Sequence, residues 1–234
     1  MKHGIFRKLL VLTVAFVLLT SFFSPQSAEA ASAKKQVKKL VANMSTYEYV
    51  MLFGMNLSVG EGYEVVLSDM EMATAAAFTA PLDDKHLTAE VGDNGWEYIY
   101  SIASSRIKKM TKKMFGKAVS YKKLPKGSWE SAKGFLAVYR NSKGKPEFYI
   151  WEGETETDFD TIKMTVKKDG KGYKVVKDVY YGYWGWGWND ESERTDANYR
   201  ITYKVEKNEV SSYGYAITGM TVECIADLTP NEGD

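Results

Sequence analysis

The chain has 234 residues, with 31 lysine and arginine residues against 30 aspartate and glutamate residues. A net charge of +1 with both signs interspersed lacks the clustered basic surface of nucleic-acid-binding proteins, so we expect no nucleic-acid partner. The single cysteine, Cys224, excludes an internal disulfide framework. The fold must therefore depend on a hydrophobic core, which a chain of this length can bury.

The first thirty residues have the pattern of a secretory signal peptide. Residues 2–8 carry three lysine or arginine side chains, and residues 9–23 are almost wholly apolar. Ala28-Glu29-Ala30 fits cleavage after Ala30, although Ala31-Ser32-Ala33 would also serve. The apolar stretch is shorter than the roughly 20 residues of a transmembrane helix. We therefore expect a secreted, extracellular protein with no transmembrane segment after cleavage.

The first half of the remaining chain has the residue spacing of helices. Residues 34–57 place apolar side chains on one helical face, which predicts one or two helices. Ser68, three residues before Glu71, predicts a helix N-terminus closed by a capping box. Apolar residues recur every three or four positions over 96–114, which predicts one long helix that ends at Gly116.

From about residue 132 the pattern changes to strands separated by short polar turns. The predicted strands are 135–140, 148–152, 161–167, 173–181, 198–205 and 215–225. Consecutive strands with short turns predict an antiparallel, meander-like sheet that is free to curve and is covered on one face. The helices of the first half are the natural cover.

The predicted fold is therefore a single secreted α+β domain over residues 31–234. Its helical part spans about 34–118, and its antiparallel β-sheet part spans about 132–226. This order of helices and sheet resembles the cystatin and nuclear-transport-factor-2 type of α+β fold. The resemblance is one of architecture alone and implies no catalytic or binding residue.

Six of the nine residues 180–188 are aromatic, and they include half of the six tryptophans. In an extended segment the three tryptophans project to one face, and the glycines between them leave the other face nearly bare. Such rings either pack in the core across the glycines or form a platform that stacks on a ligand such as a sugar ring. The predicted ligand-binding residues are Tyr183, Trp184, Trp186, Trp188, Asn189 and Asp190.

An acidic run offers a second kind of chemistry. Its carboxylates alternate along the chain at Glu152, Glu154, Glu156, Asp158 and Asp160. In an extended segment they would share one face, where solvent, neighbouring lysines or a calcium ion would relieve their repulsion. A carboxylate pair such as Glu152 and Glu154 could also act on a glycosidic bond. The residue pattern of a calcium-binding loop is not present, so we predict no metal site.

Other catalytic chemistries have little support in the sequence. After signal cleavage His86 is the only histidine, which excludes a zinc site built from several histidines. No nucleophile elbow accompanies it, and no glycine-rich phosphate loop precedes a helix. Cys224 lies in an apolar run that favours a buried thiol. We therefore predict no catalytic residue and no cofactor.

The leading hypothesis is a non-enzymatic binding or cell-envelope-associated module with a glycan or peptide ligand. One alternative is a secreted hydrolase that uses paired carboxylates. The other is a structural or interaction protein whose aromatic strand is core and whose partner docks on a sheet edge.

Overall fold

The computed structural model describes residues 25–53, 55, 57–79, 87–91, 97–127, 138–151, 157–183 and 196–226. The chain divides into two compact units, Met1–Gln36 and Val37–Asp234. Helix α2 (Pro25–Ala42) contains this boundary, and both predicted cleavage positions lie within the helix. Among the described residues, no helix is long and apolar enough to cross a membrane. The other helices and strands belong to the second unit.

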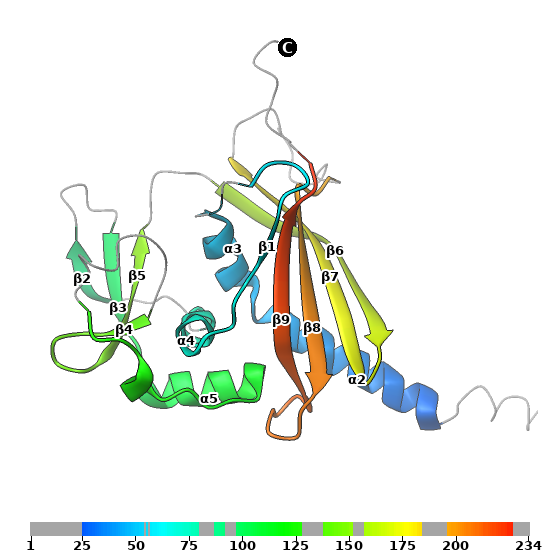
Figure 1. Ribbon diagram of the computed structural model, residues 1–234, viewed down its shortest axis with the longest axis horizontal. Helices are drawn as coiled ribbons and strands as arrows, with labels where there is room; N and C mark the ends of the chain where they lie inside the picture. Colours follow the sequence, from blue (N-terminus) through cyan, green and yellow to red (C-terminus); the bar gives the residue numbers. More distant parts are fainter. Residues whose placement is uncertain are drawn as a thin grey trace, which may run out of the picture. The chain divides into compact units, whose positions relative to one another are not determined.

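Four strands form an antiparallel meander, as predicted. They are β6 (Thr157–Asp169), β7 (Gly172–Tyr183), β8 (Tyr199–Lys207) and β9 (Tyr215–Cys224), and each lies beside the next one along the chain (Figure 1). The short strand β1 (Gly62–Glu64) pairs with β9 and extends this sheet to five strands among the described residues. The predicted α+β class, with helices ahead of an antiparallel sheet, is confirmed.

Glycines fix the turn between β6 and β7. Asp169 pairs with Gly172, so two residues make the turn. Gly170 has a φ of 52°, a left-handed conformation that glycine adopts without strain. A Cβ at Gly172 would collide with the Val205 carbonyl oxygen of β8. The turn glycine Gly170 and the close approach of β8 at Gly172 therefore both favour a reversal of the chain at this point.

A second sheet corrects the predicted six-stranded meander. Its strands lie in the order β2 (Leu87–Val91), β3 (Glu97–Ser101), β5 (Pro146–Trp151) and β4 (Val138–Arg140). The predicted hairpin of β4 and β5 forms, but β5 pairs with β3 instead of joining β6. The buried rings of Phe148 and Tyr100 stack across this pair with centroids 5.4 Å apart. The alternation of apolar and polar residues identifies a strand, but it does not identify the strand with which it pairs.

The predicted helix over 96–114 is shorter than expected. Residues 97–101 are strand β3, and helix α5 (Ser104–Phe115) begins after them. Ile99 and Tyr100 have helical spacing, but β-branched and aromatic residues also favour strands, and pairing with β5 decides the outcome. The predicted end is confirmed, because Gly116 closes the helix with a φ of 66°. Strands β1, β2 and β3 therefore lie within the part predicted as helical.

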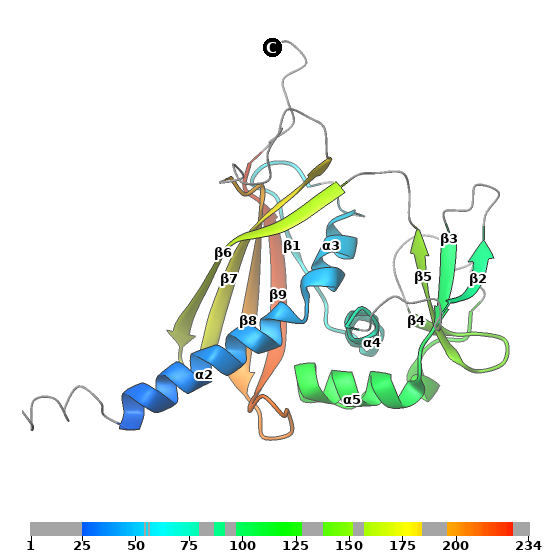
Figure 2. The same ribbon diagram turned by 180° about the vertical axis from the view of Figure 1, so that it is seen from behind.

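Two further helices belong to the helical part of the fold. Helix α3 (Ser45–Phe53) lies on the near side of the meander in Figure 2. Helix α4 (Asp69–Ala77) begins at the predicted cap, where Ser68 Oγ accepts the Glu71 N–H at 3.1 Å. Residues 72–77 are buried, and α4 packs against α5.

The hydrophobic core lies between the helices and one face of the meander. The predicted apolar face of the first helical segment is fully buried at Val37, Leu40, Val41 and Met44. Alternate residues in the middle of β7 and β8 are also buried: Val175, Lys177, Val179, Ile201, Tyr203 and Val205. A lysine among these aliphatic residues needs a partner, because an isolated buried ammonium is strongly destabilising.

Candidate functional site

Most of the predicted aromatic platform lies outside the described residues. Trp184, Trp186, Trp188, Asn189 and Asp190 belong to that part of the chain, and Tyr183 is the last residue of β7. The platform therefore stays a prediction.

The described beginning of the aromatic run packs inside the protein. Tyr180 is buried, and the Tyr181 ring lies edge-on to Tyr49 of α3, with centroids 5.9 Å apart. Tyr181 also contacts Tyr199 of β8, with centroids 6.3 Å apart. A Cβ at Gly182 would lie 2.6 Å from the Tyr180 hydroxyl oxygen, so the glycine leaves room for that ring. Tyr181 therefore packs α3 against the sheet.

The other sequence candidates do not form one site among the described residues. Glu152, Glu154, Glu156 and His86 lie outside those residues. Asp158 is half-buried and Asp160 is exposed, both on β6. Cys224 has a buried thiol, as its apolar surroundings predicted, and its Sγ lies 3.6 Å from the Ala226 carbonyl oxygen.

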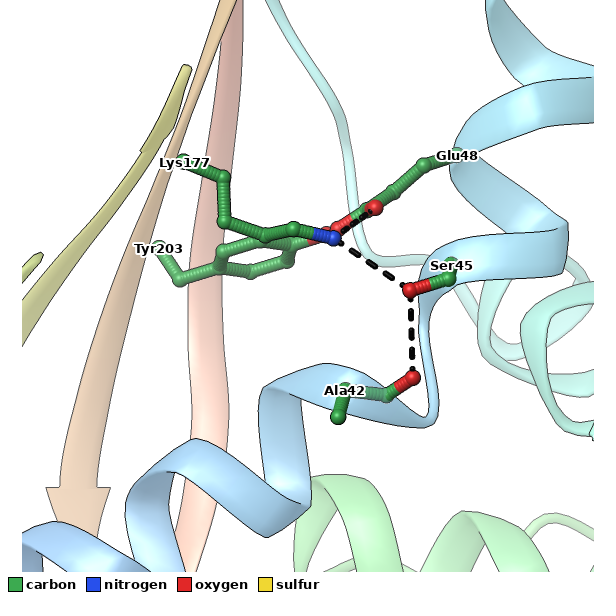
Figure 3. Close-up of polar contacts among 5 residues, drawn as sticks. All are labelled: Ala42, Ser45, Glu48, Lys177 and Tyr203. Atoms are coloured by element: carbon green, nitrogen blue, oxygen red, sulfur yellow. Dashed lines mark hydrogen bonds and ion pairs between the residues drawn. The ribbon is translucent and has the colours of Figure 1, made fainter. Parts of the chain in front are cut away.

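A polar cluster of Glu48, Lys177 and Tyr203 lies in the core between α3 and the sheet (Figure 3). One carboxylate oxygen of Glu48 pairs with the Lys177 ammonium, and the other accepts a hydrogen bond from the Tyr203 hydroxyl. The ammonium also donates to Ser45 Oγ at 3.3 Å, and Ser45 donates to the Ala42 carbonyl oxygen at 3.2 Å. Both oxygens of the carboxylate are therefore satisfied.

The Glu48–Lys177–Tyr203 cluster is structural. The side chains of Glu48 and Lys177 are 0% exposed, so a ligand in solvent cannot contact them. Burial raises the pKa of Glu48, while Lys177 acts in the opposite direction. The pKa of Tyr203 is also raised, by burial first and then by Glu48. Because each buried charge is costly without its partner, the cluster restricts where α3 can lie on β7 and β8.

A pocket of about 580 Å³ opens on another side of α3. We call it the α3–α4 pocket, because its walls come from α3, the segment around β1 and the start of α4. Its described apolar lining residues are Val50, Met51, Met55, Leu57, Val65 and Val66, and the other described lining residues are Tyr47, Tyr63, Ser68 and Glu71. A volume of this size suits a small ligand, and the methionines can adapt to its shape.

The Tyr47 hydroxyl donates a hydrogen bond to the Glu71 carboxylate in this pocket. In a complete capping box that carboxylate would instead accept the Ser68 N–H, but this N–H bonds the Val66 carbonyl oxygen at 2.7 Å. Of the two hydrogen bonds of the predicted capping box, only the one from the Glu71 N–H to Ser68 Oγ is therefore present. Sequence reasoning missed Tyr47 and assigned Glu71 to the cap alone, because the two residues lie 24 positions apart.

Burial controls the electrostatics of the α3–α4 pocket. It raises the pKa of Glu71 above its ordinary value of 4.5, and the bond from Tyr47 acts in the opposite direction. The pKa of Tyr47 is also raised, first by burial and then by Glu71. Among the described lining residues none carries a positive charge, so the pocket offers one acidic acceptor within apolar walls.

No protein-family model matches the chain, and no curated protein or solved structure matches it either.

Proposed function

We propose that the chain is an exported, non-enzymatic binding module whose α3–α4 pocket holds an apolar ligand that carries an amino group. The observation that carries this proposal is the Tyr47–Glu71 pair, a carboxylate acceptor at an otherwise mostly apolar pocket. The signal-peptide pattern of residues 1–30 supports export.

The lining supports binding through both apolar contact and charge. Burying the apolar body of a ligand against methionine, valine and leucine side chains is favourable in proportion to the area removed from water. Glu71 can accept a hydrogen bond from an ammonium, whereas a carboxylate ligand would meet repulsion. A peptide N-terminus or lysine beside an apolar residue has this chemistry, and so does an alkylamine.

The chemistry of the ligand can be tested by calorimetric titration of the purified protein with octylamine, octanol and octanoate at neutral pH. We expect octylamine to bind at least about tenfold more tightly than octanoate, since one favourable charge contact is replaced by a repulsive one. Dileucine amide, titrated in parallel, distinguishes a peptide ligand from a free amine.

A matched pair of variants tests whether octylamine binds in the α3–α4 pocket. Val66 lines the pocket with 74% of its surface exposed, so Val66→Lys adds a repulsive charge without disturbing the core. Val210 is 52% exposed and is not part of the pocket lining. We expect Val66→Lys to weaken octylamine binding and Val210→Lys to leave it unchanged. Equal effects of the two variants, or equal binding of octylamine and octanoate, would contradict the proposal.

Glycan binding through Trp184, Trp186 and Trp188 is a separate version of the binding-module hypothesis. Titration with a panel of cell-wall and plant polysaccharides, followed by tryptophan fluorescence, tests it. Loss of the response in a variant with all three tryptophans changed to alanine would support the platform. The absence of any response to the panel would contradict it.

A further inference from the structure

A second cavity, of about 630 Å³, lies beside the hairpin of β4 and β5. Three of its lining residues are cations, Lys126, Arg140 and Lys143, and one is an anion, Glu147. We call this cavity the β4–β5 pocket, and its described lining residues are all different from those of the α3–α4 pocket. Its charge is opposite in sign, so it is suited to a different ligand.

The backbone and side chain of Arg140 are fixed by contacts with residues 124–127. Its Nε donates to the Leu124 carbonyl oxygen at 2.7 Å, and its main-chain N–H donates to the Pro125 carbonyl oxygen at 3.0 Å. The Gly127 N–H donates in turn to the Arg140 carbonyl oxygen at 3.3 Å. These bonds limit the rotation of the guanidinium, so less entropy is lost when it binds a ligand.

The backbone contacts between Arg140 and residues 124–127 place a second cation, Lys126, beside Arg140. Lys126 and Arg140 are partners in a β-bridge, so their backbones are adjacent. Lys143 lies in the turn of the hairpin, where the Gly144 N–H donates to the Asn141 carbonyl oxygen at 2.8 Å. Among the described residues, none of the three cations forms an ion pair with a carboxylate.

The one carboxylate among the described lining residues already accepts a hydrogen bond. Glu147 is buried and accepts a hydrogen bond from Asn141 Nδ2 at 2.6 Å. Asn141 Oδ1 accepts the Lys145 N–H at 2.9 Å, which holds the amide in this orientation. Among the described lining residues, three positive charges against one negative charge leave a formal charge of +2.

We propose that the β4–β5 pocket binds a multivalent oxyanion, either a phosphate or a carboxylate compound, with Arg140 as its main contact. A planar guanidinium binds two oxygens of either group at once, and the two lysines add charge. This site is independent of the proposed amine-binding function, because the two pockets differ in residues and in ligand charge.

The proposal is tested by calorimetric titration of the whole protein with pyrophosphate and with citrate, at low and at high salt. The pyrophosphate and citrate arms distinguish a phosphate ligand from a carboxylate ligand. We expect at least one of them to bind, and its affinity to fall as salt increases. Failure of both to bind at low salt would overturn the proposal, and it would leave the octylamine experiment unaffected.

Variants locate the oxyanion site. Arg140→Lys keeps the charge but loses the two-oxygen contact, so we expect about a tenfold loss of affinity. Lys143→Gln removes an exposed charge with no effect on the fold, and we expect a loss of about threefold. The matched control is Lys171→Gln, an exposed lysine in the β6–β7 turn, which should not change the affinity. If Lys171→Gln weakens binding as much as Lys143→Gln, the proposed site is wrong.

Discussion

Two glutamates of this protein, the fully buried Glu48 and the half-buried Glu71, accept the same kind of hydrogen bond and have different roles. Glu48 accepts from Tyr203 and Glu71 accepts from Tyr47, and burial raises the pKa of both carboxyls. Only Glu48 also has a buried ammonium partner, Lys177. The partner and the access of solvent decide whether a carboxylate holds the fold together or remains able to bind a ligand.

The two glutamates are linked through α3. Tyr47 and Glu48 are consecutive residues, yet Glu48 contacts the sheet and Tyr47 contacts α4. By restricting the position of α3 on the sheet, the Glu48–Lys177–Tyr203 cluster also positions the wall of the α3–α4 pocket that α3 supplies. Changes on the pocket side of α3 should therefore act mainly on ligand binding, whereas loss of the Glu48–Lys177–Tyr203 cluster should act on both stability and binding.

The largest expected effect is that of Lys177→Met. This change leaves the Glu48 carboxylate buried without its counter-charge, so we expect the free energy of unfolding to fall by about 3–5 kcal/mol. Urea denaturation measures it. The triple variant Glu48→Met, Lys177→Met and Tyr203→Phe removes all three polar groups and should recover most of the loss. A single-variant loss below about 1 kcal/mol would contradict a buried ion pair.

A matched pair of tyrosine substitutions compares the two sites directly. Tyr203→Phe removes a hydrogen bond to a fully buried carboxylate and should lower the free energy of unfolding by about 2 kcal/mol. Tyr47→Phe removes the corresponding hydrogen bond to Glu71 at the pocket, where water can replace the hydroxyl. It should lower the free energy of unfolding by less than about 1 kcal/mol. Urea denaturation of both variants measures the difference. Equal losses would mean that the pocket is as inaccessible to water as the core.

The role of Glu71 in binding should be measurable as a change in the affinity of the protein for octylamine. We expect Glu71→Gln to weaken octylamine binding about tenfold, or about 1.4 kcal/mol, because the charge that attracts the ammonium is lost. Calorimetric titration measures it. Glu64→Gln on β1 is the control, since Glu64 is exposed and is not part of the pocket lining. Unchanged octylamine binding in Glu71→Gln would contradict the proposed contact.

The smallest effect is expected in the pH dependence of stability. Because the folded-state pKa of Glu71 is raised, the folded chain holds this proton more tightly than the unfolded chain. The stability contributed by the tighter binding of this proton is therefore complete below pH 4.5, the ordinary pKa of a glutamate. It is lost as the pH rises through the folded-state pKa of Glu71. Urea denaturation from about pH 4 to about pH 8 should show a smaller decline for Glu71→Gln than for the original protein. Parallel curves would contradict the raised pKa.

The candidate pocket was not predicted from the sequence. Two of its residues, Ser68 and Glu71, were predicted only as a helix cap, because a cap depends on residues three positions apart. Tyr47 was not found, because its contact with Glu71 depends on how α3 and α4 pack. Lys177 was likewise part of an ordinary alternating strand, and nothing near it in the chain indicated a buried ion pair with Glu48.

Local patterns in the sequence determined the α+β class, the meander from β6 to β9, the cap at Ser68 and the helix end at Gly116. Each depends on neighbouring residues, through side-chain alternation, turn glycines or a cap, so its physical cause is contained in a short segment. The tertiary structure alone decided that β4 and β5 join β2 and β3, that Glu48 meets Lys177, and that Tyr47 meets Glu71. These outcomes depend on which distant surfaces bury each other, and packing energy between segments has no local signature.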